Sequence, residues 1–338
     1  MVRETTVIVL GAGASKPYGL PLGAELTDEV TRFLTSNARV EYDSFLEKEF
    51  DLDGFKSLST LIRRSRTPTL DQYVSKIEDK NYRDVIKGAI AQVIVQHENR
   101  VLNDENYVKG DWVSWLYHTL LVAEPDRFND NKICFLSFNY ERLPHLLMAR
   151  CMANTFDIDI KQAVQKVYGG HVVSSDTEER SIPRFIYLHG DVGTDILYKG
   201  ENTTSEIDRR MLSTHPRSRR VNRDCHSGLS KNILTIDEGE DATKKAIEMK
   251  RDVEFVVQNA KRIFFLGMGY HRPNLDRAGF SKKSLSELNA KDVEFGGTGF
   301  KIETNSQLRN SMQGYLGEKF FMGDPDMDCL SFLQNYMT

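Results

Sequence analysis

The sequence predicts an α/β fold, with a doubly wound, mostly parallel, Rossmann-like sheet and a large helical insertion. Short β-branched or aromatic runs recur along the chain, each ends in glycine or polar residues, and segments of helical periodicity separate them. Runs of this kind are typical of parallel strands that are buried on both faces. The length of 338 residues suits one large domain with insertions or two modest domains.

The first predicted strand spans Thr6–Leu10 and leads directly into the small-residue segment Gly11–Ser15. The next residues, KPYGLPLG, are rich in Pro and Gly, which favours a loop. From residue 25 to residue 130, apolar residues recur at steps of three and four, which predicts a helical insertion. Within it, Trp112 and Trp115 are expected to pack on one helix face.

Three further buried strands are predicted, at Ile133–Phe138, Arg184–Leu188 and Arg262–Leu266. A helix is expected near 242–259, weaker strands at 293–295 and 320–322, and a last helix near 327–337. We therefore expect residues 1–24 and 131–338 to form the Rossmann-like domain, and residues 195–240 to be a polar, Arg-rich loop insertion.

Composition excludes several classes of protein. The formal charge of -4 argues against a surface built as a whole for nucleic acid or anionic membrane. No signal-peptide pattern and no apolar run near membrane-spanning length is present, so a cytoplasmic location is expected. The four cysteines form no CxxC pair, so a structural zinc site is not expected.

Ligands of parallel α/β sheets bind beyond the carboxyl ends of the strands, so the residues there are the candidates for function. Small residues after the first strand can let backbone N–H groups approach a phosphate, although chain reversal alone also favours glycine. Lys16 occupies the place of the third glycine of a dinucleotide motif. The acidic residue that such a motif needs at the end of a second strand, about 20 residues further on, is also missing, because that region is predicted to be helical. A hydride-transferring dehydrogenase is therefore disfavoured. The phosphate-loop candidates are Gly11, Ala12, Gly13, Ala14 and Ser15.

Two side chains after later strands are candidates for catalysis. Asn139 could hold a ribose hydroxyl or orient a water, although an isolated Asn there most often caps a turn or helix. His189 could serve as a general base near neutral pH, and His171 is its competitor. The segment after the fourth strand offers another close-approach loop with polar residues beyond it, namely Gly267, Met268, Gly269, Tyr270, Asn274 and Asp276.

Together, GAGAS, SFNYE, LHG and LGMGY, in this order, resemble the sirtuin superfamily, and most closely its bacterial NAD-hydrolysing antiphage effectors. The likeness spans Val7 to about Asp276. By this resemblance, Gly11–Ser15 match the nucleotide loop, and Asn139 and His189 match the catalytic Asn and His. Glu141 stands where the family carries Asp, and Gly267 and Gly269 match the loop that holds the adenosine half of NAD.

Departures from the deacylating branch point to hydrolysis. The chain lacks the zinc ribbon, and GLPLGAEL stands in place of a GIPDFR-like segment. The resemblance therefore implies an NAD glycohydrolase that releases nicotinamide and ADP-ribose, with NAD as substrate and no metal. Asn139 would position the ribose and the water, and His189 would accept a proton.

The resemblance also implies that the activity is controlled. It implies a homo-oligomeric abortive-infection effector that a separate sensor protein activates. A HerA-like ATPase or a short Argonaute is a candidate for that sensor. The arginines of Arg209–Arg223 could contact nucleic acid, a partner or the NAD phosphates, or could simply be solvated. Three alternatives stay open: a non-catalytic NAD- or ADP-ribose-binding subunit, a zinc-free deacylase or ADP-ribosyltransferase, and a nucleic-acid-binding protein or nuclease. Nor does the sequence separate NAD from NADP, or hydrolysis from cyclisation.

Overall fold

The computed structural model describes residues 1–36, 52–67, 69–104, 108–121, 123–175, 178–192, 233, 244–299 and 314–337. Its centre is a six-stranded sheet in the order β5-β2-β1-β6-β7-β8, in which every neighbouring pair of strands is parallel. This confirms the predicted sheet, the two weaker strands included. The strands are β1 (Thr6–Leu10), β2 (Ile133–Ser137), β5 (Phe185–Tyr187), β6 (Arg262–Leu266), β7 (Glu294–Gly297) and β8 (Phe320–Met322).

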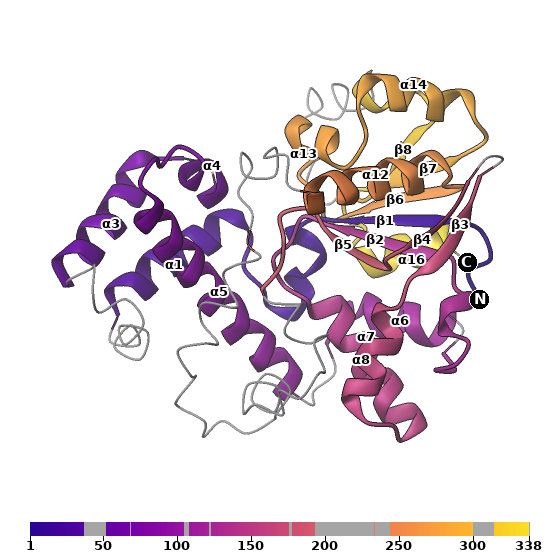
Figure 1. Cartoon of the computed structure of the whole chain (residues 1–338), viewed down its shortest axis with the longest axis horizontal. Coiled ribbons are helices and arrows are strands. Elements are labelled where there is room, and N and C mark those ends of the chain that lie inside the picture. The colour runs from indigo at the N-terminus through magenta and orange to yellow at the C-terminus, as the bar shows by residue number, and fades with distance from the viewer. Residues whose placement is uncertain are drawn as a thin grey trace.

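Helices cover both faces of the sheet (Figure 1). Alternate residues of β1 enter two separate hydrophobic cores, Ile8 on one face and Val9 on the other. Burial of both faces explains why the central strand β1 is almost entirely apolar. The helices on the Ile8 face are α6 (Trp112–Thr119), α7 (Leu143–Phe156), α8 (Ile160–Tyr168) and α16 (Cys329–Tyr336). Those on the Val9 face are α12 (Lys244–Gln258), α13 (Arg272–Arg277) and α14 (Lys282–Ala290).

Four helices form a third hydrophobic core to one side of the sheet (Figure 1). They are α1 (Gly23–Thr35), α3 (Leu52–Ser65), α4 (Leu70–Val74) and α5 (Lys80–Asn103), and we call them the helical unit. The helix α6 lies within the same expected insertion but buries Trp112 completely in the core of the sheet, with Trp115 packed at its edge. Tyr140 and Val192, from the segments after β2 and β5, belong to the core of the helical unit.

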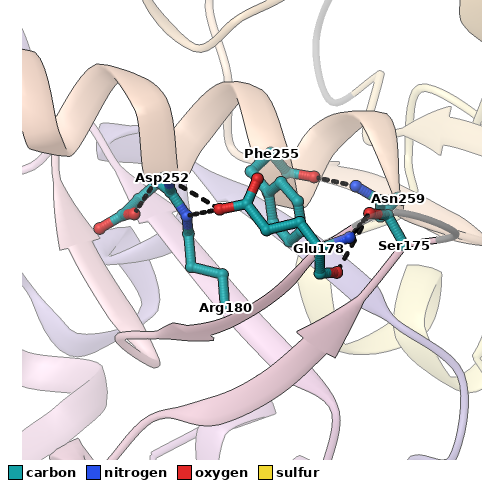
Figure 2. Close-up of polar contacts among 6 residues, drawn as sticks. All are labelled: Ser175, Glu178, Arg180, Asp252, Phe255 and Asn259. Carbon is teal, nitrogen blue, oxygen red and sulfur yellow. Dashed lines mark hydrogen bonds and ion pairs between the residues drawn. The ribbon is translucent and has the colours of Figure 1, made fainter.

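A hairpin that the sequence did not predict lies against the Val9 face. Its strands β3 (His171–Ser174) and β4 (Glu179–Ile182) are antiparallel. Figure 2 shows Arg180 of the hairpin reaching α12, where it forms an ion pair with Asp252 at 2.9 Å. The same guanidinium lies 3.1 Å from Glu178 and over the ring of Phe255. These contacts fasten the hairpin to α12.

Within the described ranges, no helix has the length and apolar character needed to cross a membrane. The Arg-rich stretch Arg209–Arg223 and Cys225 lie outside the described residues.

Candidate active site

The candidate site lies at the carboxyl edge of the sheet, where β1, β2, β5 and β6 end. After β1 the chain fills one side of the sheet with β2 and β5, and later fills the other side with β6, β7 and β8. The order therefore reverses between β1 and β6, which is where open α/β sheets bind ligands. The structure brings to this edge the segments Gly11–Ser15, Asn139–Glu141, His189–Gly190 and Gly267–Tyr270.

The two glycine loops pack directly on each other. The backbone N–H of Gly13 donates to the carbonyl of Gly267 at 3.0 Å, and the N–H of Gly11 donates to Leu266 O at 2.9 Å. A Cβ on Gly267 would lie 1.9 Å from the backbone nitrogen of Ala14, and its φ is +60°. Glycine is required here because two backbones meet.

Backbone N–H groups of the loop Gly11–Ser15, which a bound phosphate would need as donors, already form hydrogen bonds within the protein. The N–H groups of Ala14 and Ser15 donate to Gly11 O and Ala12 O at 2.9 and 3.2 Å. Four N–H groups of Gly11–Ser15 therefore bond within the protein. A phosphate placed on this loop would have to share or replace these bonds.

Ser15, Asn139 and Glu141 form one buried hydrogen-bonded cluster. The Ser15 hydroxyl donates to Glu141 Oε1. Asn139 Nδ2 donates to Gly11 O at 3.0 Å and to Ser15 Oγ at 3.3 Å. Because a carbonyl oxygen only accepts, the contact with Gly11 O fixes which way the amide lies. Asn139 Oδ1 is therefore the acceptor on the opposite branch of the side chain.

The carboxyl of Glu141 is tuned towards neutral pH. Its burial raises the pKa of Glu141 to about 7, the Glu98 carboxylate adds to this, and the Ser15 hydrogen bond opposes it. Glu98 belongs to α5 of the helical unit and forms a buried ion pair with Arg142, at 2.6 Å between Oε2 and Nη2. The backbone N–H of Arg142 also donates to Glu98.

His189 follows β5 and is buried between aromatic rings. The ring of Phe138 meets it edge-on with centroids 5.4 Å apart, and the ring of Tyr140 lies at 6.2 Å. Burial, together with the positive charge of Arg277, lowers the pKa of His189 to about 3. The imidazole is therefore neutral at physiological pH, and its buried Nε2 has no hydrogen-bond partner within the described part of the chain.

Several other residues predicted from the sequence are buried or form hydrogen bonds within the protein. Tyr270 is buried and its hydroxyl donates to Thr298 O at 2.8 Å, so this group is engaged with the protein. Met268 is also buried, whereas Gly269 is exposed. Asn274 is half-buried on α13, and the exposed Asp276 accepts a hydrogen bond from Tyr315 at 2.8 Å.

His171 does not compete for the site. It begins β3 and is buried, and the positive charges that act on it are Arg184 and Lys132. Those two residues precede β5 and β2, so His171 lies towards the amino-terminal edge of the sheet.

Sequence reasoning missed the residues of the helical unit that reach the site. The Tyr140 hydroxyl donates to Asp71 of α4, and burial raises the pKa of Asp71 to about 6, opposed by Arg277. Glu98 and Arg142 were missed as well. No motif marks Asp71 or Glu98, because charged residues on helices are most often solvated.

In the described part of the chain, no group of three or more His, Cys, Asp and Glu side chains is arranged to hold a metal ion. No protein-family model matches this chain, and no curated protein matches it. The chemistry of the site is therefore argued from its geometry: a buried amide, a carboxyl that titrates near neutrality and a neutral imidazole. These groups suit the orientation of a hydroxyl or a water and the transfer of a proton.

Proposed function

We propose that the chain is an NAD glycohydrolase that cleaves NAD to nicotinamide and ADP-ribose. The observation that carries the proposal is the bonded cluster of Ser15, Asn139 and Glu141 at the switch point of the sheet, with His189 at the same edge. The motif resemblance supports the same reaction. With it we propose a cytoplasmic antiphage effector that acts as a homo-oligomer or with a partner such as a HerA-like ATPase or a short Argonaute.

Hydrolysis breaks the bond between ribose C1′ and the nicotinamide nitrogen, and the electron pair neutralises the pyridinium charge. Water oxygen bonds to C1′, and one water proton must leave. Asn139 Oδ1 can accept a hydrogen bond from that water and so orient it. Little acid assistance is needed because the leaving group is already cationic.

The proton assignment differs from the expectation that His189 is the base. A general base works best when its pKa is near the working pH. The pKa of about 7 suits Glu141 to accept the proton, whereas the pKa of about 3 makes His189 a weak base. We therefore assign proton acceptance to Glu141. The neutral His189 ring would then accept a hydrogen bond from a ribose hydroxyl.

The test is nicotinamide release from NAD at several enzyme concentrations. Asn139→Ala, His189→Ala and Glu141→Gln should each lower the rate by about 100-fold or more, the scale of a lost proton-transfer or orienting group. Glu78→Gln is the matched control, because Glu78 is exposed. A rate that rises faster than linearly with enzyme would support assembly-dependent activation. If each of the three single variants releases nicotinamide at the wild-type rate, the assignment is contradicted.

A second candidate is a non-catalytic NAD- or ADP-ribose-binding subunit. The low pKa of His189 and the internal bonding of the Gly11–Ser15 N–H groups favour it. It predicts NAD or ADP-ribose binding, measured by calorimetry, without nicotinamide release under any condition of assembly. Absence of both binding and turnover would refute both candidates.

A further inference from the structure

The helical unit holds the two chain neighbours of Glu141. Tyr140, between Asn139 and Glu141, donates its hydroxyl to Asp71 of α4. Arg142, on the other side, is bonded through its backbone N–H and its guanidinium to Glu98 of α5. Two helices distant in sequence from this segment therefore bond to the residues before and after Glu141.

The Tyr140 ring extends this contact towards His189. The ring is buried in the core of the helical unit and lies 6.2 Å from the imidazole, centroid to centroid. The carbonyl of Tyr140 also accepts a hydrogen bond from the N–H of Val192 at 3.0 Å. Val192 follows His189 by three residues and belongs to the same core. Tyr140 is therefore in contact with both chain segments of the site.

Asp71 is an ionisable residue, and a contact that served packing alone would not need one. Burial disfavours the charged form of Asp71, and an apolar side chain would avoid that cost. What the carboxyl adds is a fixed acceptor for one hydroxyl, so the Tyr140 ring has one orientation. Arg277 acts electrostatically on both Asp71 and His189, so the same charged surroundings extend over both groups.

We propose that Asp71 is a positioning residue of the site: through Tyr140 it fixes the placement of Asn139, Glu141 and His189, and the helical unit is thereby a working part of the site. The inference rests on the proposed function for its kinetic readout. A misplacement of about 1 Å remote from the reacting atoms can cost about 100-fold in rate.

The kinetic test compares Asp71→Ala, Asp71→Asn and Tyr140→Phe. We expect kcat for nicotinamide release to fall by about 100-fold in Asp71→Ala and in Tyr140→Phe, with KM nearly unchanged. Asp71→Asn keeps an oxygen that accepts from Tyr140 and should retain most of the activity. The double variant Asp71→Ala/Tyr140→Phe should be no worse than either single change. Asp84→Ala is the matched control, because Asp84 is an exposed aspartate of the same unit.

A second readout needs no turnover. The imidazole nitrogen resonances of His189, assigned from the spectrum of His189→Ala, should shift in Asp71→Ala and Tyr140→Phe but not in Asp71→Asn or Asp84→Ala. If wild type releases no nicotinamide under any condition of assembly and the resonances shift in this pattern, the proposed function fails and the positioning role stands. If folded Tyr140→Phe keeps the wild-type resonances, the positioning role is refuted. Tyr140→Phe removes one oxygen, so it serves even where Asp71→Ala does not fold.

Discussion

Replacing Glu141 by Gln should stabilise the protein at alkaline pH while it removes activity. The residue is 4% exposed, and burial raises the pKa of its carboxyl from 4.5 to about 7. The folded protein therefore binds this proton more tightly than the unfolded chain does. The contribution of this carboxyl to stability is complete below pH 4.5 and is lost as the pH rises through 7.

The size of the effect follows from the same two pKa values. A carboxyl pKa raised from 4.5 to about 7 corresponds to about 3 kcal/mol of penalty on the charged, folded form. Gln carries no charge at any pH and keeps an oxygen that can accept from Ser15. Relative to wild type, Glu141→Gln should therefore gain up to about 3 kcal/mol in free energy of unfolding between acid and alkaline pH.

Urea unfolding of both proteins between about pH 4.5 and pH 8.5 measures this difference, and other titrating groups cancel in the comparison. Glu78→Gln, at an exposed carboxylate, should show almost no such pH dependence. The rate of nicotinamide release should rise with pH around a midpoint near 7 in wild type, and the variant should lack that rise. A stability difference that is the same at every pH would refute the assignment of a buried, proton-binding carboxyl.

Three further predictions concern stability. Gly267→Ala should cost about 3 kcal/mol or more, because its Cβ would lie 1.9 Å from Ala14 N, whereas Gly19→Ala, at φ +80° with open space, should cost about 1 kcal/mol by thermal unfolding. Burial lowers the pKa of His171 from 6.5 to about 4, so its contribution to stability is lost as pH falls from 6.5 towards 4. In wild type the free energy of unfolding in urea should fall between pH 7 and pH 5, and in His171→Phe this fall should be smaller by about 2 kcal/mol. An equal fall in both proteins would contradict this. Glu98→Ala removes the carboxylate that is paired with the buried guanidinium of Arg142 and should cost about 3–5 kcal/mol, more than the double variant Glu98→Leu/Arg142→Met.

The central sheet could be predicted because burial leaves a direct mark on a strand. Every residue of β1 and β2 is buried, and four of the five residues in each strand are apolar, with polar or small residues after them. The hairpin β3–β4 was missed for the opposite reason: its strands alternate or are largely polar. Its position depends on the contacts of Arg180 with α12, which no local pattern encodes.

The positions of the site residues were predictable, but their properties were not. Parallel strands present their carboxyl ends at one edge, so Ser15, Asn139 and His189 could be placed there from the sequence. The protonation of His189 depends on its burial and on Arg277, which is distant in sequence. The requirement for glycine at position 267 depends on two loops that pack on each other. These are properties of tertiary packing, which residue type and spacing do not reveal.

The helical unit affects the site electrostatically as well as by positioning its residues. A buried ion pair such as Glu98–Arg142 seldom stabilises a fold more than an apolar pair would, so its effect on its surroundings matters more. The Glu98 carboxylate contributes to the raised pKa of Glu141, and Asp71 holds Tyr140 next to it in the chain. No residue of the six central strands lies in the core of the helical unit. The helical unit therefore acts on the segment of Glu141 through Glu98 and Asp71, and not through the central strands.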